Sequence, residues 1–218
     1  MTKTHLLILW ALIAAQLALG LILVNRLPPR IPIHWDIHGR ADGYGSWAAA
    51  VTLPAMCTFM SAMLMVLPLI GPLRENLERS KVAYGSIAIV VIGFLTVVHI
   101  CTLLIALGVN VPMIRIMMVA IGIMYALIGR WIGKLRRNWW AGIRTPWTLA
   151  SDVVWERTHQ AAGKMFLVVG IAIAAIGLIV ASWIAVIALI ASTLAVAVWS
   201  LAYSYHVHRQ VTGATHEQ

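Results

Sequence analysis

The chain has 218 residues, of which 61% are hydrophobic and only 11% are charged, which excludes a soluble globular domain and indicates an integral membrane protein. A net charge of +9 would suggest nucleic-acid binding in a soluble protein, but here the basic residues lie at the ends of apolar segments. We therefore expect the lipid bilayer as their partner and no direct contact with nucleic acid. Both cysteines fall within apolar segments, so they indicate neither a disulfide framework nor a metal site.

Apolar segments of bilayer length recur along the chain and predict an all-α, polytopic membrane protein with about six transmembrane helices. The first is long enough to be a retained span rather than a signal peptide. The last apolar tract would measure roughly 60 Å as one helix, so we expect a helical hairpin that turns near residues 181–183. The segments are residues 6–24, 48–73, 82–107, 111–132 and 165–205.

The basic residues predict the orientation of these spans. The chain has 16 lysines and arginines. If the spans alternate in direction, only four of them lie on the side of the membrane opposite to the amino terminus, namely Arg26, Arg30, Arg40 and Arg115. Because basic residues concentrate on the cytoplasmic side, we expect both termini in the cytoplasm. Residues 1–110 then form three spans with an extracytoplasmic loop at 25–47, and residues 111–218 form three spans with a cytoplasmic loop at 133–163.

The extracytoplasmic loop begins with three prolines, which keep the backbone extended, and continues with turn signals around Gly39 and Asp42. We expect a compact cap on the outer surface. Its imidazoles and carboxylates have three open roles, namely hydrogen bonding within the cap, contact with a ligand, or binding of a metal such as zinc. These side chains are His34, Asp36, His38 and Asp42.

The cytoplasmic loop mixes aromatic, basic and turn-forming residues in a pattern that membrane insertion does not require. Thr148 or Ser151 is expected to cap a short amphipathic helix over residues 152–162, lying along the membrane or under the bundle, with Trp155, Thr158 and His159 on one face.

Arg144 is costly in lipid and needs backbone carbonyls, a carboxylate such as Asp152 or Glu156, or an anionic partner. The loop either folds against the bundle or forms a binding surface. It contains no nucleophile–base pair, so we expect no enzyme and no cofactor.

His99 lies deep within the third apolar segment, where titratable groups often mark transport pathways. The alternative is a hydrogen bond to a neighbouring carbonyl, to Thr96 or to Thr102. The two halves of the chain also share one plan of spans and loops, as in transporters with inverted repeats, although we find no convincing residue identity between them.

Two regions resemble the SdpI family of bacterial membrane immunity proteins. The segment from residue 27 to residue 46, with His34, Gly39 and Asp42, resembles a domain of unknown function, DUF1648, that often precedes this family, although Trp47 replaces an expected Lys. The cytoplasmic loop resembles the motif of the family itself. The motif residues are Asn138, Gly142, Arg144, Thr145, Pro146, Trp147, Thr148, Trp155, Thr158, His159 and Gly163.

The resemblance implies a multi-pass protein of the bacterial cytoplasmic membrane that protects the cell from a secreted toxic peptide or protein. It also implies signalling, in which the cytoplasmic face recruits a transcriptional repressor. Two other functions stay open on the residues alone. One is a transporter or exporter with inverted three-helix halves, and the other is a metal-dependent membrane enzyme that uses the cap residues.

Overall fold

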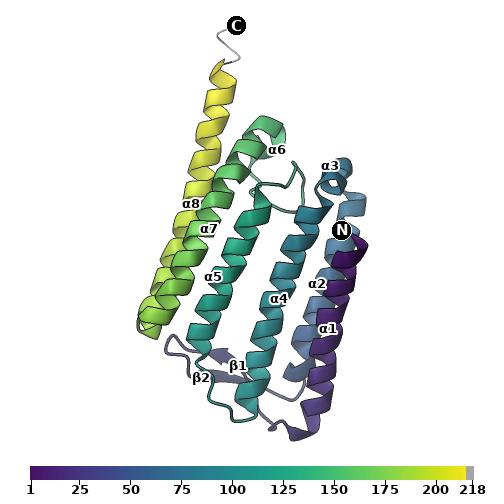
Figure 1. The fold of residues 1–218 in the computed structure, drawn as a ribbon, viewed down its shortest axis with the longest axis vertical. Helices are drawn as coiled ribbons and strands as arrows, with labels where there is room; N and C mark the ends of the chain where they lie inside the picture. Colours follow the sequence, from purple (N-terminus) through teal and green to yellow (C-terminus); the bar gives the residue numbers. More distant parts are fainter. Residues whose placement is uncertain (215–218) are drawn as a thin grey trace.

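The computed structural model describes residues 1–214 and consists mostly of long helices packed side by side (Figure 1). Within these residues, six helices are long and apolar enough to cross a membrane, so the chain is a multi-pass membrane protein. They are α1 (Lys3–Leu23), α2 (Ala49–Ile70), α4 (Lys81–Ala106), α5 (Met113–Ile132), α7 (Asp152–Ile179) and α8 (Ser182–Ala214). Shorter elements join them: η1 (Val24–Arg26), β1 (Ile31–Trp35), β2 (Ala41–Gly45), α3 (Arg74–Arg79) and α6 (Pro146–Ala150).

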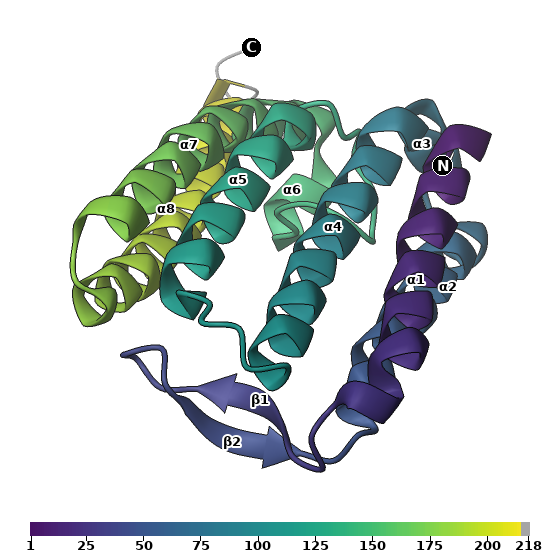
Figure 2. The same ribbon diagram turned by 60° about the horizontal axis from the view of Figure 1, so that its bottom comes forward.

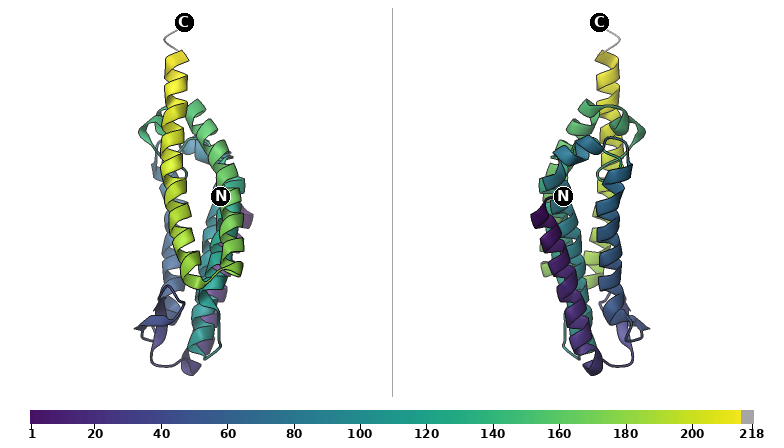
Figure 3. Two further views of the ribbon diagram at one scale, coloured as in Figure 1. Left: turned by 90° about the vertical axis from the view of Figure 1, so that its left-hand side faces the viewer. Right: turned by 90° about the vertical axis from the view of Figure 1, so that its right-hand side faces the viewer.

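The two ends of the bundle differ. One, the hairpin end, carries β1 and β2, and the other, the loop end, carries α3 and α6 (Figure 1). The amino terminus and the last described turns of α8 both lie toward the loop end, and α8 extends beyond the other helices there (Figure 3). Which side of the membrane this end faces stays a prediction. Residues 215–218, where the predicted second half ends, lie outside the described residues.

Helices α1, α2 and α4 form one group around a shared apolar core. Leu9 and Ile13 of α1 meet Cys57 of α2 and Ile92 of α4, and all four side chains are buried. Burial of such side chains against one another is what aligns apolar helices whose outer faces contact lipid.

A polar cluster is buried within this first group. The side chain of Gln16 donates from Nε2 to Oγ1 of Thr96 at 2.9 Å, and its backbone carbonyl accepts from Nε2 of His99 at 3.2 Å. His99 is 1% exposed. The histidine therefore binds a neighbouring carbonyl, which is the first of the alternatives expected from the sequence.

Helices α5, α7 and α8 form the second group, in which the backbones of α5 and α7 touch. A Cβ atom on Gly122 would lie 2.5 Å from the carbonyl oxygen of Gly170, and one on Gly129 would lie 2.6 Å from that of Gly163. The reverse contacts, from Gly163 and Gly170 to the carbonyls of Gly129 and Gly122, are equally close. Only glycine permits such an approach, so these positions fix how α5 sits against α7.

The loop after α1 contains a small β-sheet, which corrects the expectation of an all-α protein. Strands β1 and β2 pair antiparallel and lie beneath the helix ends (Figure 2). The prolines keep this segment extended as predicted, but the turn falls at residues 36–40, with Gly39 at a φ of +81°. Gly43, expected in a turn, lies in β2, where a Cβ atom would come within 2.8 Å of the Cβ of His34.

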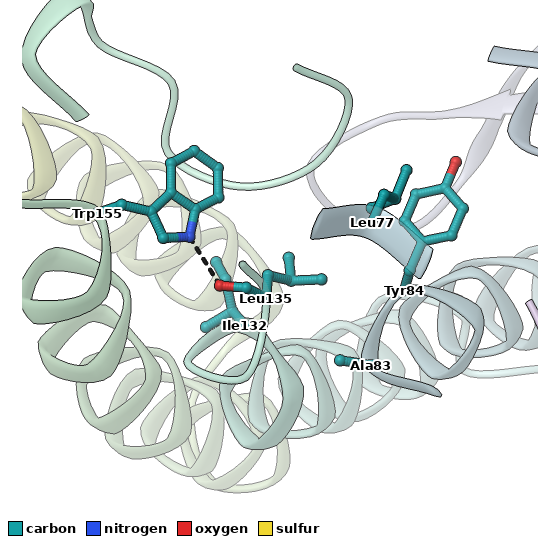
Figure 4. Close-up of a cluster of buried hydrophobic side chains, with 6 residues drawn as sticks. All are labelled: Leu77, Ala83, Tyr84, Ile132, Leu135 and Trp155. Atoms are coloured by element: carbon teal, nitrogen blue, oxygen red, sulfur yellow. Dashed lines mark hydrogen bonds between the residues drawn. The ribbon is translucent and has the colours of Figure 1, made fainter. Parts of the chain in front are cut away.

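The two helix groups meet along α4 and α5 and are joined at both ends. At the loop end, Leu77 of α3 and Tyr84 of α4 belong to one buried cluster with Ile132, Leu135 and Trp155 (Figure 4). At the hairpin end, the position of a Cβ on Gly39 lies 3.0 Å from Cγ1 of Ile114, beside the first turn of α5.

The second half departs from the sequence-based expectation in one respect. Residues 152–162 do not form a separate helix on the membrane surface. They are the first three turns of α7, which continues without a break to Ile179. The amphipathic pattern was correct, but its buried face packs onto α5 and the preceding loop. The expected turn between the last two spans is confirmed, because α7 ends at Ile179 and α8 begins at Ser182.

Candidate functional site: the motif loop at the loop end

The motif loop, residues 133–151, connects α5 to α7 and is organised around Asn138. The side chain is 1% exposed, and its Oδ1 accepts hydrogen bonds from the backbone N–H groups of Trp140 and Ala141, both at 2.8 Å. Its Nδ2 donates to the carbonyls of Arg136 at 2.8 Å and Ala141 at 3.1 Å. All the hydrogen-bonding capacity of this amide serves to turn the backbone, which explains a buried asparagine at this position.

His159 joins the loop to α7. Its Nε2 accepts from the backbone N–H of Ile143 at 2.9 Å, and its Nδ1 lies 2.8 Å from the carbonyl oxygen of Trp155. Because an amide N–H can only donate and a carbonyl can only accept, the ring is neutral with its proton on Nδ1. The ring is 0% exposed and stacks on the indole of Trp155 with a centroid distance of 3.9 Å. Neither nitrogen is free to transfer a proton to a substrate.

Gly142 is required by this arrangement. Its φ is +116°, a conformation that residues with a side chain rarely adopt. A Cβ atom there would also collide with the ring of His159. The glycine therefore lets the backbone pass directly over the histidine, so that the next N–H can reach Nε2.

The threonine pair in the motif builds a helix cap. Thr145 is the N-cap of α6, and its side chain accepts from the backbone N–H of Thr148 at 3.2 Å. The hydroxyl of Thr148 in turn accepts from the N–H of Thr145 at 2.8 Å and donates to the carbonyl of Ile143. Pro146 follows at the first helical position, where the missing N–H costs nothing. A reciprocal cap of this kind fixes a helix of only five residues.

Trp147 fastens the loop to α8. Its indole Nε1 donates to Oγ of Ser204 at 2.8 Å, and its ring contacts those of Tyr205 and His208. A partner far along the chain could not be read from the sequence, and the motif alone gave no reason to connect it with the last helix.

The buried face of α7 carries the remaining motif residues. Trp155 donates from Nε1 to the carbonyl of Leu135 at 2.7 Å (Figure 4). Gly163 packs against the backbone of Gly129. Thr158 is 0% exposed, yet its hydroxyl has no hydrogen-bond partner within residues 1–214.

Charged side chains at the surface of the loop bind its backbone and each other. Arg144 is exposed and donates from Nη1 to the carbonyl of Trp139 at 2.7 Å, so of its expected partners the structure provides a backbone carbonyl. Asp152 pairs instead with Arg137, whose Nε lies 2.7 Å from Oδ1 of the aspartate. Arg137 also donates to the carbonyl of Leu149 at 2.7 Å. Sequence reasoning missed this role of Arg137.

The cap residues lie at the opposite end of the molecule. Nδ1 of His34 donates to Oδ1 of Asp42 across the two strands at 2.6 Å, and both side chains are largely exposed. Within residues 1–214, no group of three or more histidine, cysteine, aspartate or glutamate side chains is arranged to hold a metal ion. The expected cluster therefore divides into a histidine–aspartate pair and a separate turn.

Asp36 organises that turn. It accepts from the backbone N–H groups of Arg40 and His38, both at 2.9 Å, and from the guanidinium of Arg40. The backbone N–H of Arg40 is the main cause that lowers the pKa of this carboxyl below its ordinary value. Asp36 thus shapes the tip that presents Gly39.

Comparisons with known proteins agree with the position of both regions. Residues 134–204 match the SdpI/YfhL protein family, and residues 11–58 match the domain of unknown function DUF1648. The chain carries an SdpI/YfhL family region behind an amino-terminal DUF1648 domain. The SdpI/YfhL region contains the whole motif from Asn138 to Gly163, and the DUF1648 match contains His34, Gly39 and Asp42.

One curated relative is similar along nearly the whole chain. Immunity protein SdpI of Bacillus subtilis (strain 168) is 26% identical over 198 residues, which cover 89% of this chain and 91% of that protein. The chain is therefore a distant homologue of that SdpI. No solved structure gives a significant match.

One signal in the second half of the chain was overlooked. Gly163, Gly170 and Gly177 of α7 recur every seven residues, as do Gly122 and Gly129 of α5. Small residues at such spacing mark a close helix pair in membrane proteins. The spacing would have predicted the contact between α5 and α7.

Proposed function

We propose that this protein is an immunity and signalling protein of the bacterial cytoplasmic membrane, which protects the cell from a secreted toxic peptide or protein. The observation that carries the proposal is the similarity to an immunity protein along nine-tenths of both chains. A match that included only a few membrane spans could reflect shared hydrophobicity, whereas this one includes both the hairpin and the motif loop.

In this proposal both termini and the loop end lie in the cytoplasm, and the hairpin end faces outward, as the basic residues predict. The half 1–110 contributes the hairpin on the outer side, and the half 111–218 contributes the motif loop on the inner side. The exposed pair of His34 and Asp42 lies where an external toxin arrives. At the loop end, Trp139 is 45% exposed and Arg144 is exposed beside it, which offers a cytoplasmic repressor an aromatic and cationic surface.

The motif has a supporting role in this mechanism. Asn138, Thr148 and His159 are buried, and their polar atoms form hydrogen bonds with the backbone of the loop. They therefore position the surface around Arg144 rather than contact a partner themselves. This division assigns binding to exposed residues and architecture to buried ones.

The test is survival of cells that lack this protein when they are challenged with culture supernatants of toxin-secreting bacteria. We expect the wild-type chain to restore survival, and His34→Ala with Asp42→Ala to reduce protection at unchanged membrane levels. Arg157→Ala, an exposed change on α7, is the matched control. Lack of protection by the wild-type chain against every toxic supernatant would contradict the proposal.

Signalling is tested separately from protection. Arg144→Ala removes the exposed guanidinium and only one hydrogen bond to the loop. We expect it to abolish toxin-dependent transcription of a reporter under the native promoter while survival on constitutive expression is retained. Loss of both functions at normal protein levels would refute the assignment of the loop to signalling.

A further inference from the structure

A large apolar groove lies along the seam between the two helix groups. It has a volume of about 680 Å³ and lies between α4 and α5, which are neighbours in Figure 2. Gly93 leaves open space on the α4 side, where a Cβ atom would meet nothing within 4 Å. On α4 the lining includes Val90, Phe94 and Val97, and on α5 it includes Val119, Ile123 and Leu127.

The groove lies within the membrane-spanning part of the protein. Its lining on α5 extends from Arg115 to Leu127, which corresponds to about 18 Å along a helix axis, more than half of a hydrocarbon core of about 30 Å. An apolar groove at this depth is open to lipid. It does not hold water, because its walls offer water almost no hydrogen-bonding partner.

Among the described residues, Arg115 is the one charged residue that lines the groove, and it lies at the hairpin end. The side chain is exposed, and within residues 1–214 it has no hydrogen bond or ion pair. A guanidinium near the membrane surface without a carboxylate partner is suited to an anionic phosphate, which it binds through two parallel N–H donors.

We propose that the groove binds one acyl chain of an anionic phospholipid, whose headgroup phosphate pairs with Arg115. The apolar walls take the chain and the guanidinium takes the charge, so the lining matches both parts of one molecule. A transmembrane helix is a poorer occupant, because α4 and α5 remain in contact and a helix measures about 10–12 Å across.

The bound lipid has a structural consequence. The helix groups are joined by the buried cluster at the loop end and by the contact of Gly39 with Ile114 at the hairpin end. Between these ends, the acyl chain fills the seam and supplies contacts that the protein itself does not make. This inference stands independently of the proposed immunity function.

Native mass spectrometry of the full chain in mild detergent tests the proposal with phosphatidylglycerol and phosphatidylcholine as probes. For the wild type we expect one tightly retained phosphatidylglycerol, bound about tenfold more strongly than phosphatidylcholine. Arg115→Gln should remove this preference, and Gly93→Phe, which fills the groove, should weaken retention of both lipids about tenfold.

Two variants control for general effects. Arg26→Gln removes another arginine at the hairpin end, and Ala195→Phe adds an aromatic ring on a lipid-exposed position of α8. Neither should change lipid retention. Unchanged retention in both Gly93→Phe and Arg115→Gln would overturn the proposal. A wild-type dimer that Gly93→Phe converts to a monomer would also overturn it and assign the groove to a second copy of the chain.

Discussion

The hairpin and the motif loop differ in the reach and in the burial of their polar contacts. In the hairpin, His34 binds Asp42 and Asp36 binds Arg40, and these contacts are local and exposed to solvent. At the motif loop, His159 and Trp155 of α7 are buried and bind backbone groups of the loop 16 and 20 residues away. The comparison teaches that the more distinctive sequence belongs to the region where buried side chains hold distant backbone segments together, while the polar contacts of the hairpin stay within one turn and one strand pair.

The largest expected effect comes from His159→Ala. The substitution leaves the N–H of Ile143 without its partner and opens a cavity beside Trp155, which should cost about 2–4 kcal/mol. Thermal unfolding in detergent, followed by tryptophan fluorescence, measures this loss. Arg157→Ala on the same helix should change stability by less than about 0.5 kcal/mol. A stable His159→Ala protein would break the comparison, because the motif would then not hold the loop.

Gly142→Ala should destabilise the protein by roughly 2 kcal/mol, since the new Cβ meets the ring of His159 at a φ that alanine tolerates poorly. The same unfolding measurement applies. Gly93→Ala is the matched glycine control. Its new methyl group meets open space, and alanine is more favourable than glycine within a helix, so this change should not destabilise the protein. Equal unfolding midpoints for the two variants would argue against close packing of the loop over the histidine.

Thr158→Val sharpens the comparison within the motif. The hydroxyl is buried without a partner, so its removal should leave stability unchanged or raise it by about 1 kcal/mol. Unfolding and toxin survival are measured together. Lower stability would show that the hydroxyl has a structural partner, whereas lost protection in a stable protein would identify Thr158 as a functional group.

The smallest effect on stability is expected in the hairpin. Asp42→Asn weakens an exposed pair and should change the unfolding free energy by no more than about 0.5 kcal/mol. Hydrogen exchange over residues 31–45 should remain close to that of the wild type. If the hairpin instead loses its protection, Asp42 has the same kind of structural role as the motif residues, and the contrast between the two regions disappears.

The sequence predicted the spans well, because hydrocarbon thickness sets the length of an apolar helix and the last tract was too long to cross once. The helix expected over residues 152–162 begins where α7 begins, but its expected end was wrong for an equally physical reason. In the structure, Gly163 is the point where α7 meets the backbone of Gly129, and the helix continues past it. Nothing else between Asp152 and Met165 ends a helix.

The candidate site was predictable in composition but not in its contacts. The shared face of Trp155, Thr158 and His159 follows from helical spacing and is confirmed by their burial. The bond from Ile143 to His159 and the bond from Trp147 to Ser204 depend on how separate helices pack. A single sequence does not contain that packing, except where repeated glycines reveal which helices approach each other.

The contact between the hairpin tip and α5 has a mechanical consequence. Gly39 rests against Ile114, and the backbones of α5 and α7 interlock through glycines along their length. A helix pair whose backbones touch without intervening side chains leaves little room for relative motion. We therefore expect α5 and α7 to move together as one rigid unit about 30 Å long. A toxin that displaces the hairpin would push on one end of this unit, and the motif loop, which is attached to the other end, would shift with it. Distances between spin labels on the hairpin tip and on α6 would reveal such coupled motion.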